Sequence, residues 1–144
     1  MIRISRRAAL VGAGATLAAP ATIRAQTAPV KVGVILPTSG VLAVPGQASR
    51  RGIDLAARVV AEAGGPRLEI HHADIASRPE NGRVAAERLI REGCSVLIGA
   101  WDSGATISAA QAAEAARVPL VVNIASAPQI TEQGFSMVFR NFSP

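Results

Sequence analysis

The chain has 144 residues, of which 49% are hydrophobic and 17% charged, a balance that is typical of one folded domain and excludes a disordered protein. The formal net charge of +5 would by itself suggest a nucleic-acid partner. However, four arginines and no acid fall within the first 25 residues, and the rest of the chain has 11 basic and 10 acidic residues. We therefore expect no nucleic-acid partner.

The first 25 residues have the pattern of an export signal. A basic start, MIRISRRAAL, precedes the apolar run VGAGATLAA, which is too short to span a bilayer. Ala25 offers a small residue for cleavage, and the pair Arg6 and Arg7 resembles the twin-arginine export motif, although general secretion stays open. We expect a cleaved signal over residues 1–25 and a periplasmic mature chain; the alternative is an uncleaved amphipathic anchor.

The residues that commonly bind metals or phosphates are few. Cys94 is the only cysteine, which excludes an internal disulfide, and it begins an apolar run where a small buried thiol is expected. His71 and His72 are adjacent, so on a strand they would point to opposite faces and could not easily share a metal ion. No glycine-rich loop ends in Lys-Ser or Lys-Thr. We expect no metal and no cofactor.

From Val30 onward, segments with the periods of strands and helices alternate. Short apolar runs that stop at proline or glycine predict strands, and apolar residues three or four positions apart predict helices. The strands are predicted over 30–36, 67–74, 94–99, 119–123 and 137–140, and the helices over 46–63, 79–92, 103–118 and 128–133. This alternation predicts an α/β fold with a doubly wound, mostly parallel sheet and helices on both faces.

Ligands of such sheets bind beyond the carboxyl ends of the strands, where the strand order reverses. The loops predicted at that edge carry hydroxyls or glycine: PTSGVLAVPG, WDSGAT and IASAP. Ser103 starts a predicted helix and Ser126 follows the next strand, so their hydroxyls and nearby N–H groups could hold a carboxylate. The same serines could instead be helix caps, and the spacing leaves both interpretations open.

A catalytic interpretation has less support. Trp101 stands where a nucleophile elbow, G-x-S-x-G, requires glycine, and nothing pairs Ser103 with either histidine. Asp74 and Asp102 could suggest a magnesium site or a phosphorylated aspartate, but they follow different strands without a third carboxylate nearby in the sequence. Asp74 is better explained as a cap or as a residue at the rim of the crevice, and no catalytic residue is expected.

Several segments taken together resemble one family. They are VGVILPTSG followed by Gly46, SRPENGRVAAERLI, VLIGAWDSGAT, VPLVVNIASAP and ITEQGFSMVFRNFSP. From Val30 to Pro144 the chain is similar to the start of the branched-chain amino-acid type of periplasmic substrate-binding protein, the receptor of ABC importers. The resemblance implies that the protein binds a small carboxylate-bearing solute, such as an amino acid or amide, and passes it to a membrane permease.

The resemblance also implies which residues form the site. They are Ser103, Thr106 and Trp101 after the third predicted strand, and Ser126, Ile124 and Ala125 after the fourth. The family's carboxylate-binding hydroxyls align with Ser103 and Ser126. Pro45 stands where many members have an aromatic residue, which leaves the solute's side chain open. Ser77 and Asp102 occupy the places at which some members carry a disulfide.

Members of the family have two lobes that close on the ligand. The resemblance ends at Pro144, so we expect an N-terminal fragment in which residues 26–144 form the first part of lobe 1 and the second lobe is absent. The full-length receptor is expected to be a monomer. Two other functions stay open, a ligand-sensing regulatory domain of the same fold and an enzyme on a doubly wound scaffold.

Overall fold

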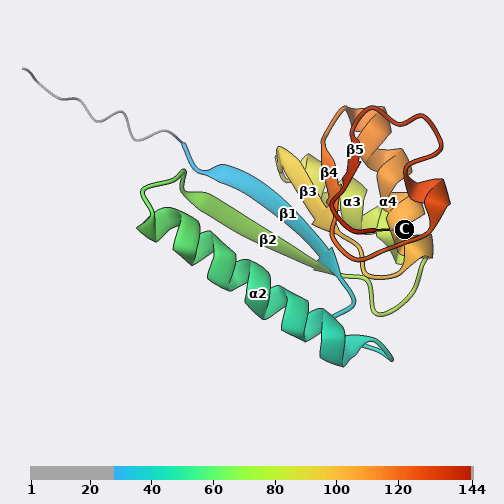
Figure 1. The fold of residues 1–144 in the computed structure, drawn as a ribbon, viewed down its shortest axis with the longest axis horizontal. Coiled ribbons are helices and arrows are strands. Elements are labelled where there is room, and N and C mark those ends of the chain that lie inside the picture. Colours follow the sequence, from blue (N-terminus) through green and yellow to red (C-terminus); the bar gives the residue numbers. More distant parts are fainter. Residues whose placement is uncertain (1–27, 144) are drawn as a thin grey trace, which may run out of the picture.

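The computed structural model describes residues 28–143, and the export signal predicted over residues 1–25 lies outside them. Strands and helices alternate along the described chain, as predicted (Figure 1). They are β1 (Val30–Leu36), α2 (Ala43–Glu62), β2 (Leu68–Asp74), α3 (Asn81–Arg91), β3 (Val96–Gly99), α4 (Ser103–Ala116), β4 (Leu120–Val122), the 3-10 helix η1 (Pro128–Ile130) and β5 (Val138–Arg140). None of the helices in this part of the chain is long and apolar enough to cross a membrane.

The strands form one sheet in the order β2-β1-β3-β4-β5, and every pairing is parallel. The chain leaves β1 for β2 on one side and then crosses to β3 on the other, so the strand order reverses between β1 and β3. Helix α2 lies on one face of the sheet, and α3 and α4 lie on the other (Figure 1). The predicted α/β fold with a doubly wound parallel sheet is confirmed.

Alternation along the strands divides the core into two clusters, one on each face. In β3, Leu97 is fully buried in the cluster beneath α3 and α4. Its neighbours Val96 and Ile98 pack instead with the cluster on the α2 face. On that face, α2 and the sheet enclose an apolar hollow of about 320 Å³. β5 is an edge strand of the sheet. Its Phe139 is 54% exposed, so apolar side-chain surface is accessible at this edge.

Small residues set the spacing between α3 and α4. A Cβ on Gly82 of α3 would lie against the carbonyl oxygen of Ala105 in α4, so glycine is required for this close approach. The buried side chains of α4 are mostly alanines, which let the helix pack closely on the sheet. This packing places the first residue of α4, Ser103, directly after the carboxyl end of β3.

The predicted boundaries shift at the prolines. Helix α2 begins at Ala43 instead of Gly46, because Pro45 fits the first helical turn, where an N–H group has no acceptor within the helix. Helix α3 begins at Asn81, two residues after Pro79. A tighter turn precedes it, in which the Asn81 N–H donates to the carbonyl of Arg78 at 3.1 Å.

Candidate functional site

The loop between β3 and α4 leaves the sheet beside the end of β1. Gly99, the last residue of β3, has φ +132°, and a Cβ there would lie against the carbonyl oxygen of Ile35. Only glycine combines this backbone conformation with so close an approach. The loop therefore carries Trp101 and Ser103 to the carboxyl edge of the sheet, next to the point where the strand order reverses.

Asp102, and not Ser103, caps α4. The Asp102 carboxylate accepts a hydrogen bond from the Ala105 N–H at 2.8 Å, and its backbone carbonyl accepts one from the Thr106 N–H at 3.0 Å. The short helix η1 follows Ala127 and has no side-chain cap, so Ser126 is not a cap either. The alternative that both serines are helix caps is therefore wrong.

A hydrogen bond joins the two serine loops. The backbone N–H of Ala127, the residue after Ser126, donates to the Ser103 hydroxyl oxygen at 3.4 Å. Ser103 is half-buried and Ser126 is exposed. The structure thus brings the loop after β3 and the loop after β4 together at the carboxyl edge of the sheet.

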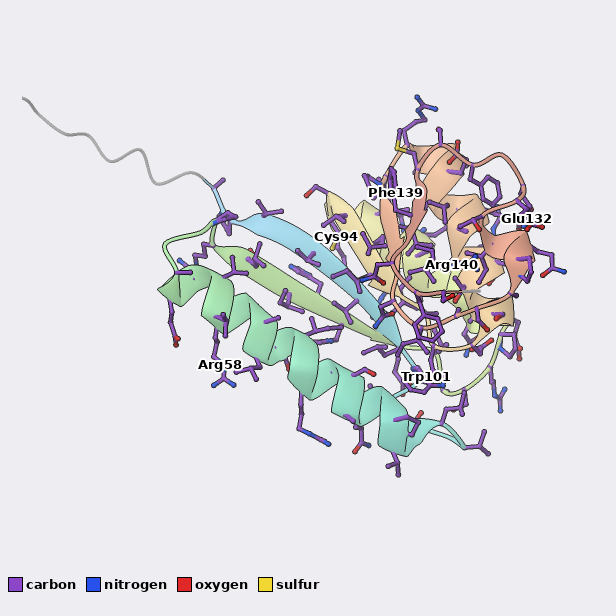
Figure 2. The ribbon with its side chains drawn as sticks, viewed as in Figure 1. Arg58, Cys94, Trp101, Glu132, Phe139 and Arg140 are labelled. Atoms are coloured by element: carbon purple, nitrogen blue, oxygen red, sulfur yellow. The ribbon has the colours of Figure 1, made fainter. Side chains whose placement is uncertain are left out.

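The other predicted site residues differ in accessibility. Thr106 is completely buried, and its hydroxyl bonds to the carbonyls of Ala100 at 3.1 Å and Asp102 at 2.7 Å. Its side chain therefore points inward and holds the β3–α4 loop. Ala125 is also buried, whereas Ile124 and Trp101 are half-buried. Figure 2 shows Trp101 at the end of the sheet toward which the strand arrows point.

Arg140 also belongs to this edge, and the sequence pattern does not predict it. It is the last residue of β5, and one guanidinium nitrogen, Nη1, donates to the carbonyl of Ser126 at 3.1 Å and to that of Ala127 at 3.0 Å. Figure 2 shows its side chain beside the strands. The signal that could have identified it is a cation at the end of a predicted parallel strand, because such ends share one edge.

The loop after β1 is held by Asp74, at the end of β2. Its Oδ1 atom accepts hydrogen bonds from the N–H groups of Thr38 at 2.8 Å, Ser39 at 3.2 Å and Ala76 at 2.8 Å. Burial by itself would raise the pKa of Asp74, but hydrogen bonds from the Ser39 side chain and from these N–H groups together lower it below its ordinary value. Asp74 therefore shapes this edge as an ionised carboxylate.

Ser77 and Asp102, the two positions at which some relatives are expected to have a disulfide, both form hydrogen bonds. The Ser77 hydroxyl donates to the carbonyl of Ser39 at 2.8 Å and accepts from the Leu42 N–H at 3.0 Å. Asp102, at the other place, caps α4. Ser77 thus ties the loop after β2 to the loop after β1 without a covalent bond.

The two histidines make contacts away from the serine loops. His71 lies 2.8 Å from Glu69 and 3.4 Å from Glu92, whereas His72 lies 2.8 Å from Asp54 of α2. The prediction that the two histidines occupy opposite faces is confirmed. Within residues 28–143, no three histidine, cysteine, aspartate or glutamate side chains are grouped so that they could hold a metal ion.

The predicted burial of the single thiol is also confirmed. Cys94 is 3% exposed. Burial, together with the nearby Glu92 carboxylate, raises the pKa of its thiol above the ordinary value. A buried thiol of this kind is a packing residue and not a nucleophile.

Comparison with known families gives a match over most of the chain. Residues 29–143 match the model of the family described as periplasmic binding protein. A Leu/Ile/Val-binding protein homologue of Brucella abortus is 34% identical over 143 residues, which cover 96% of this chain and 35% of the relative. The chain therefore spans about a third of the length of this relative.

Solved structures give the same result. A branched-chain amino acid transporter substrate-binding protein of Streptococcus pneumoniae, in complex with isoleucine, is similar with a TM-score of 0.76 and 28% identity, over 81% of this chain and 34% of that one. A solute-binding protein of an ABC transporter of R. palustris, in complex with benzoate, has a TM-score of 0.70 and 32% identity, over 78% of this chain and 32% of that one. These similar proteins bind substrates for transporters and are not enzymes.

Proposed function

The chain belongs to the periplasmic binding protein family, and from this premise we propose that it forms part of an extracytoplasmic receptor of an ABC importer. The receptor binds a small carboxylate-bearing solute and delivers it to a membrane permease. Residues 1–25 direct export and are removed, and the mature chain lies in the periplasm. Residues 26–144 supply the first part of lobe 1, and the full-length receptor is a monomer.

One observation carries this proposal, the hydrogen bond from the Ala127 N–H to the Ser103 hydroxyl. It places two loops that each carry a serine side by side at the carboxyl edge of a parallel sheet, the edge at which such folds bind ligands. Neither serine is used as a helix cap. The Asp102 carboxylate accepts from the Ala105 N–H, and the earlier N–H groups, those of Ser103 and Gly104, have no acceptor within the helix, so they favour an anion at this place.

The ligands of the two similar structures narrow the class of solute. Isoleucine and benzoate share a carboxylate and an apolar body, but benzoate has no ammonium group. A carboxylate is therefore the group that we expect Ser103 and Ser126 to bind, with Trp101, Ile124 and the backbone at Ala125 beside it. Thr106 supports the site from within, since its buried hydroxyl holds the loop that carries Ser103.

The test is calorimetry on the full-length protein with isoleucine, benzoate and the corresponding neutral amides. We expect Ser103→Ala and Ser126→Ala each to weaken carboxylate binding about tenfold to a hundredfold, because a hydrogen bond to a charged group is worth about 1.5–3 kcal/mol. The neutral amides should bind weakly to every variant.

Ser108→Ala is the matched control. It removes a hydroxyl from the same helix, but that hydroxyl contacts the carbonyls of Pro79 and Ala105 and lies away from the serine loops. It should leave affinity unchanged. Binding that is equally strong in Ser103→Ala, Ser126→Ala and the wild type, with all three folded, would contradict the assignment of the site.

A further inference from the structure

The two serine loops are connected to a third element, the end of β5, through one side chain. Arg140 donates from Nη1 to the carbonyl oxygens of Ser126 and Ala127, at 3.1 and 3.0 Å. Arg140 is half-buried, and the donor is a cationic guanidinium. Both bonds are therefore charge-assisted, which makes them stronger than bonds between neutral groups.

One peptide bond links Arg140 to Ser103, because its carbonyl accepts from Arg140 and its N–H donates to Ser103. The peptide between Ser126 and Ala127 is planar and trans, so its C=O and its N–H point in opposite directions. Arg140 holds the C=O, and the N–H on the other side donates to the Ser103 hydroxyl. A rotation of this peptide would break both contacts at once.

The next peptide adds a second point of attachment. The Ala127 carbonyl also accepts from Arg140, and the residue that follows is Pro128, which has no N–H group. The Ala127 carbonyl also accepts from the Ile130 N–H of η1 at 3.1 Å, so Arg140 and η1 hold it together. Two successive carbonyls held by one nitrogen leave this stretch of the loop little freedom to turn.

We infer that Arg140 is the positioning residue of the site: it fixes the peptide between Ser126 and Ala127 and so sets where the loop that carries Ser126 lies relative to the Ser103 hydroxyl. The consequence for solute binding rests on the function proposed above, whereas the consequence for the loop does not. Arg140 also places a positive charge beside this loop, which favours a bound anion.

The first test needs no solute. Hydrogen exchange of the full-length protein, read by mass spectrometry in a peptide over residues 124–128, reports the Ala127 N–H. We expect exchange about tenfold faster in Arg140→Gln than in the wild type, because the peptide is released, and an intermediate rate in Arg140→Lys, which keeps the charge but places its donor nitrogen differently. Unchanged exchange in Arg140→Gln would overturn the inference.

Arg117→Gln is the matched control. Arg117 donates to the Ser136 hydroxyl at 3.2 Å, just before β5, so this variant removes the same charge at the opposite end of that strand. It should leave exchange in the 124–128 peptide unchanged. Thermal unfolding of each variant shows whether the fold is retained, and Arg140→Lys tests the inference if Arg140→Gln does not fold.

The second test measures by calorimetry the affinity of the full-length protein and its variants for isoleucine and benzoate. Arg140→Gln should bind the solute about tenfold to a hundredfold more weakly, with partial rescue in Arg140→Lys. A wild type that binds no carboxylate would refute the proposed function and leave the exchange result standing. If the wild type and Arg140→Gln bind the solute equally strongly, the positioning role of Arg140 is refuted and the proposed function is not.

Discussion

Asp74 accepts a hydrogen bond from the backbone N–H of Thr38 at 2.8 Å, which joins the end of β2 to the loop after β1. These strands are neighbours in the sheet, and Leu36 pairs with Asp74 in their register. The carboxylate therefore stands beside the point at which β1 ends. Its bonds to Ser39 and Ala76 make it the organising residue of this part of the edge.

Replacing Asp74 with asparagine should reveal a pH-dependent contribution to stability. The native pKa of Asp74 lies below the ordinary value of 3.8, so its ionised form stabilises the fold above that pH, and this contribution is lost as pH falls through the native pKa. We expect Asp74→Asn to lower the free energy of unfolding at neutral pH. In urea titrations the difference from the wild type should shrink below pH 3.8.

Glu132→Gln controls for net charge, because it removes one negative charge from an exposed side chain in the turn after η1 (Figure 2). A difference between Asp74→Asn and the wild type that stays constant across the acidic range would contradict the role assigned to the carboxylate.

Gly99→Ala should destabilise the protein more than an ordinary glycine replacement. The positive φ alone costs about 1–3 kcal/mol for a residue with a Cβ, and the added carbon would also meet the carbonyl oxygen of Ile35. Gly64→Ala is the matched control, since Gly64 has φ +78° with no described atom within 4 Å of the added carbon. Chemical unfolding measures both. Equal losses would show that the contact with β1 is unimportant.

Cys94 should resist alkylation in the native protein. It is buried, and burial raises the pKa of its thiol, so little thiolate is exposed to the reagent at neutral pH. Mass spectrometry after iodoacetamide treatment should show slow labelling of the native chain and complete labelling in denaturant. A Cys94→Ser, Ser95→Cys double variant, with its thiol at the adjacent exposed position, should react about tenfold faster or more. Rapid native labelling of Cys94 would contradict the packing described here.

The export hypothesis predicts a new N-terminus at Gln26. The basic start, the apolar run and Ala25 come in the order that a signal peptidase requires. Mass spectrometry of a periplasmic extract should therefore find a peptide that begins at Gln26. Arg6→Lys with Arg7→Lys should block export if the twin-arginine route is used and have little effect under general secretion. Protein that retains Met1 and stays in the cytoplasm would refute cleavage and export together.

Much of the fold could be predicted from local pattern. The sequence predicts the strand over 30–36 with the bounds that the structure shows, because its apolar run ends at Pro37 and its last five residues are buried between two layers. The placement of His71 and His72 on opposite faces followed from the two-residue period of a strand alone. The start of α2 was less predictable, because Pro45 is compatible with a position inside the first turn as well as before it.

The alternation of strands and helices, and the edge of the sheet at which the serines lie, follow from the residue pattern, because the burial of one face gives each segment a regular spacing of apolar residues. The three-dimensional fold selects which of two neighbours caps α4, since Asp102 and Ser103 are both good caps and the extended backbone of Asp102 makes it the cap. It also decided that Arg140 holds the Ser126 loop. That contact depends on the parallel pairing of β4 with β5 and on the orientation of one peptide plane. Neither can be predicted from the apolar spacing within a single segment.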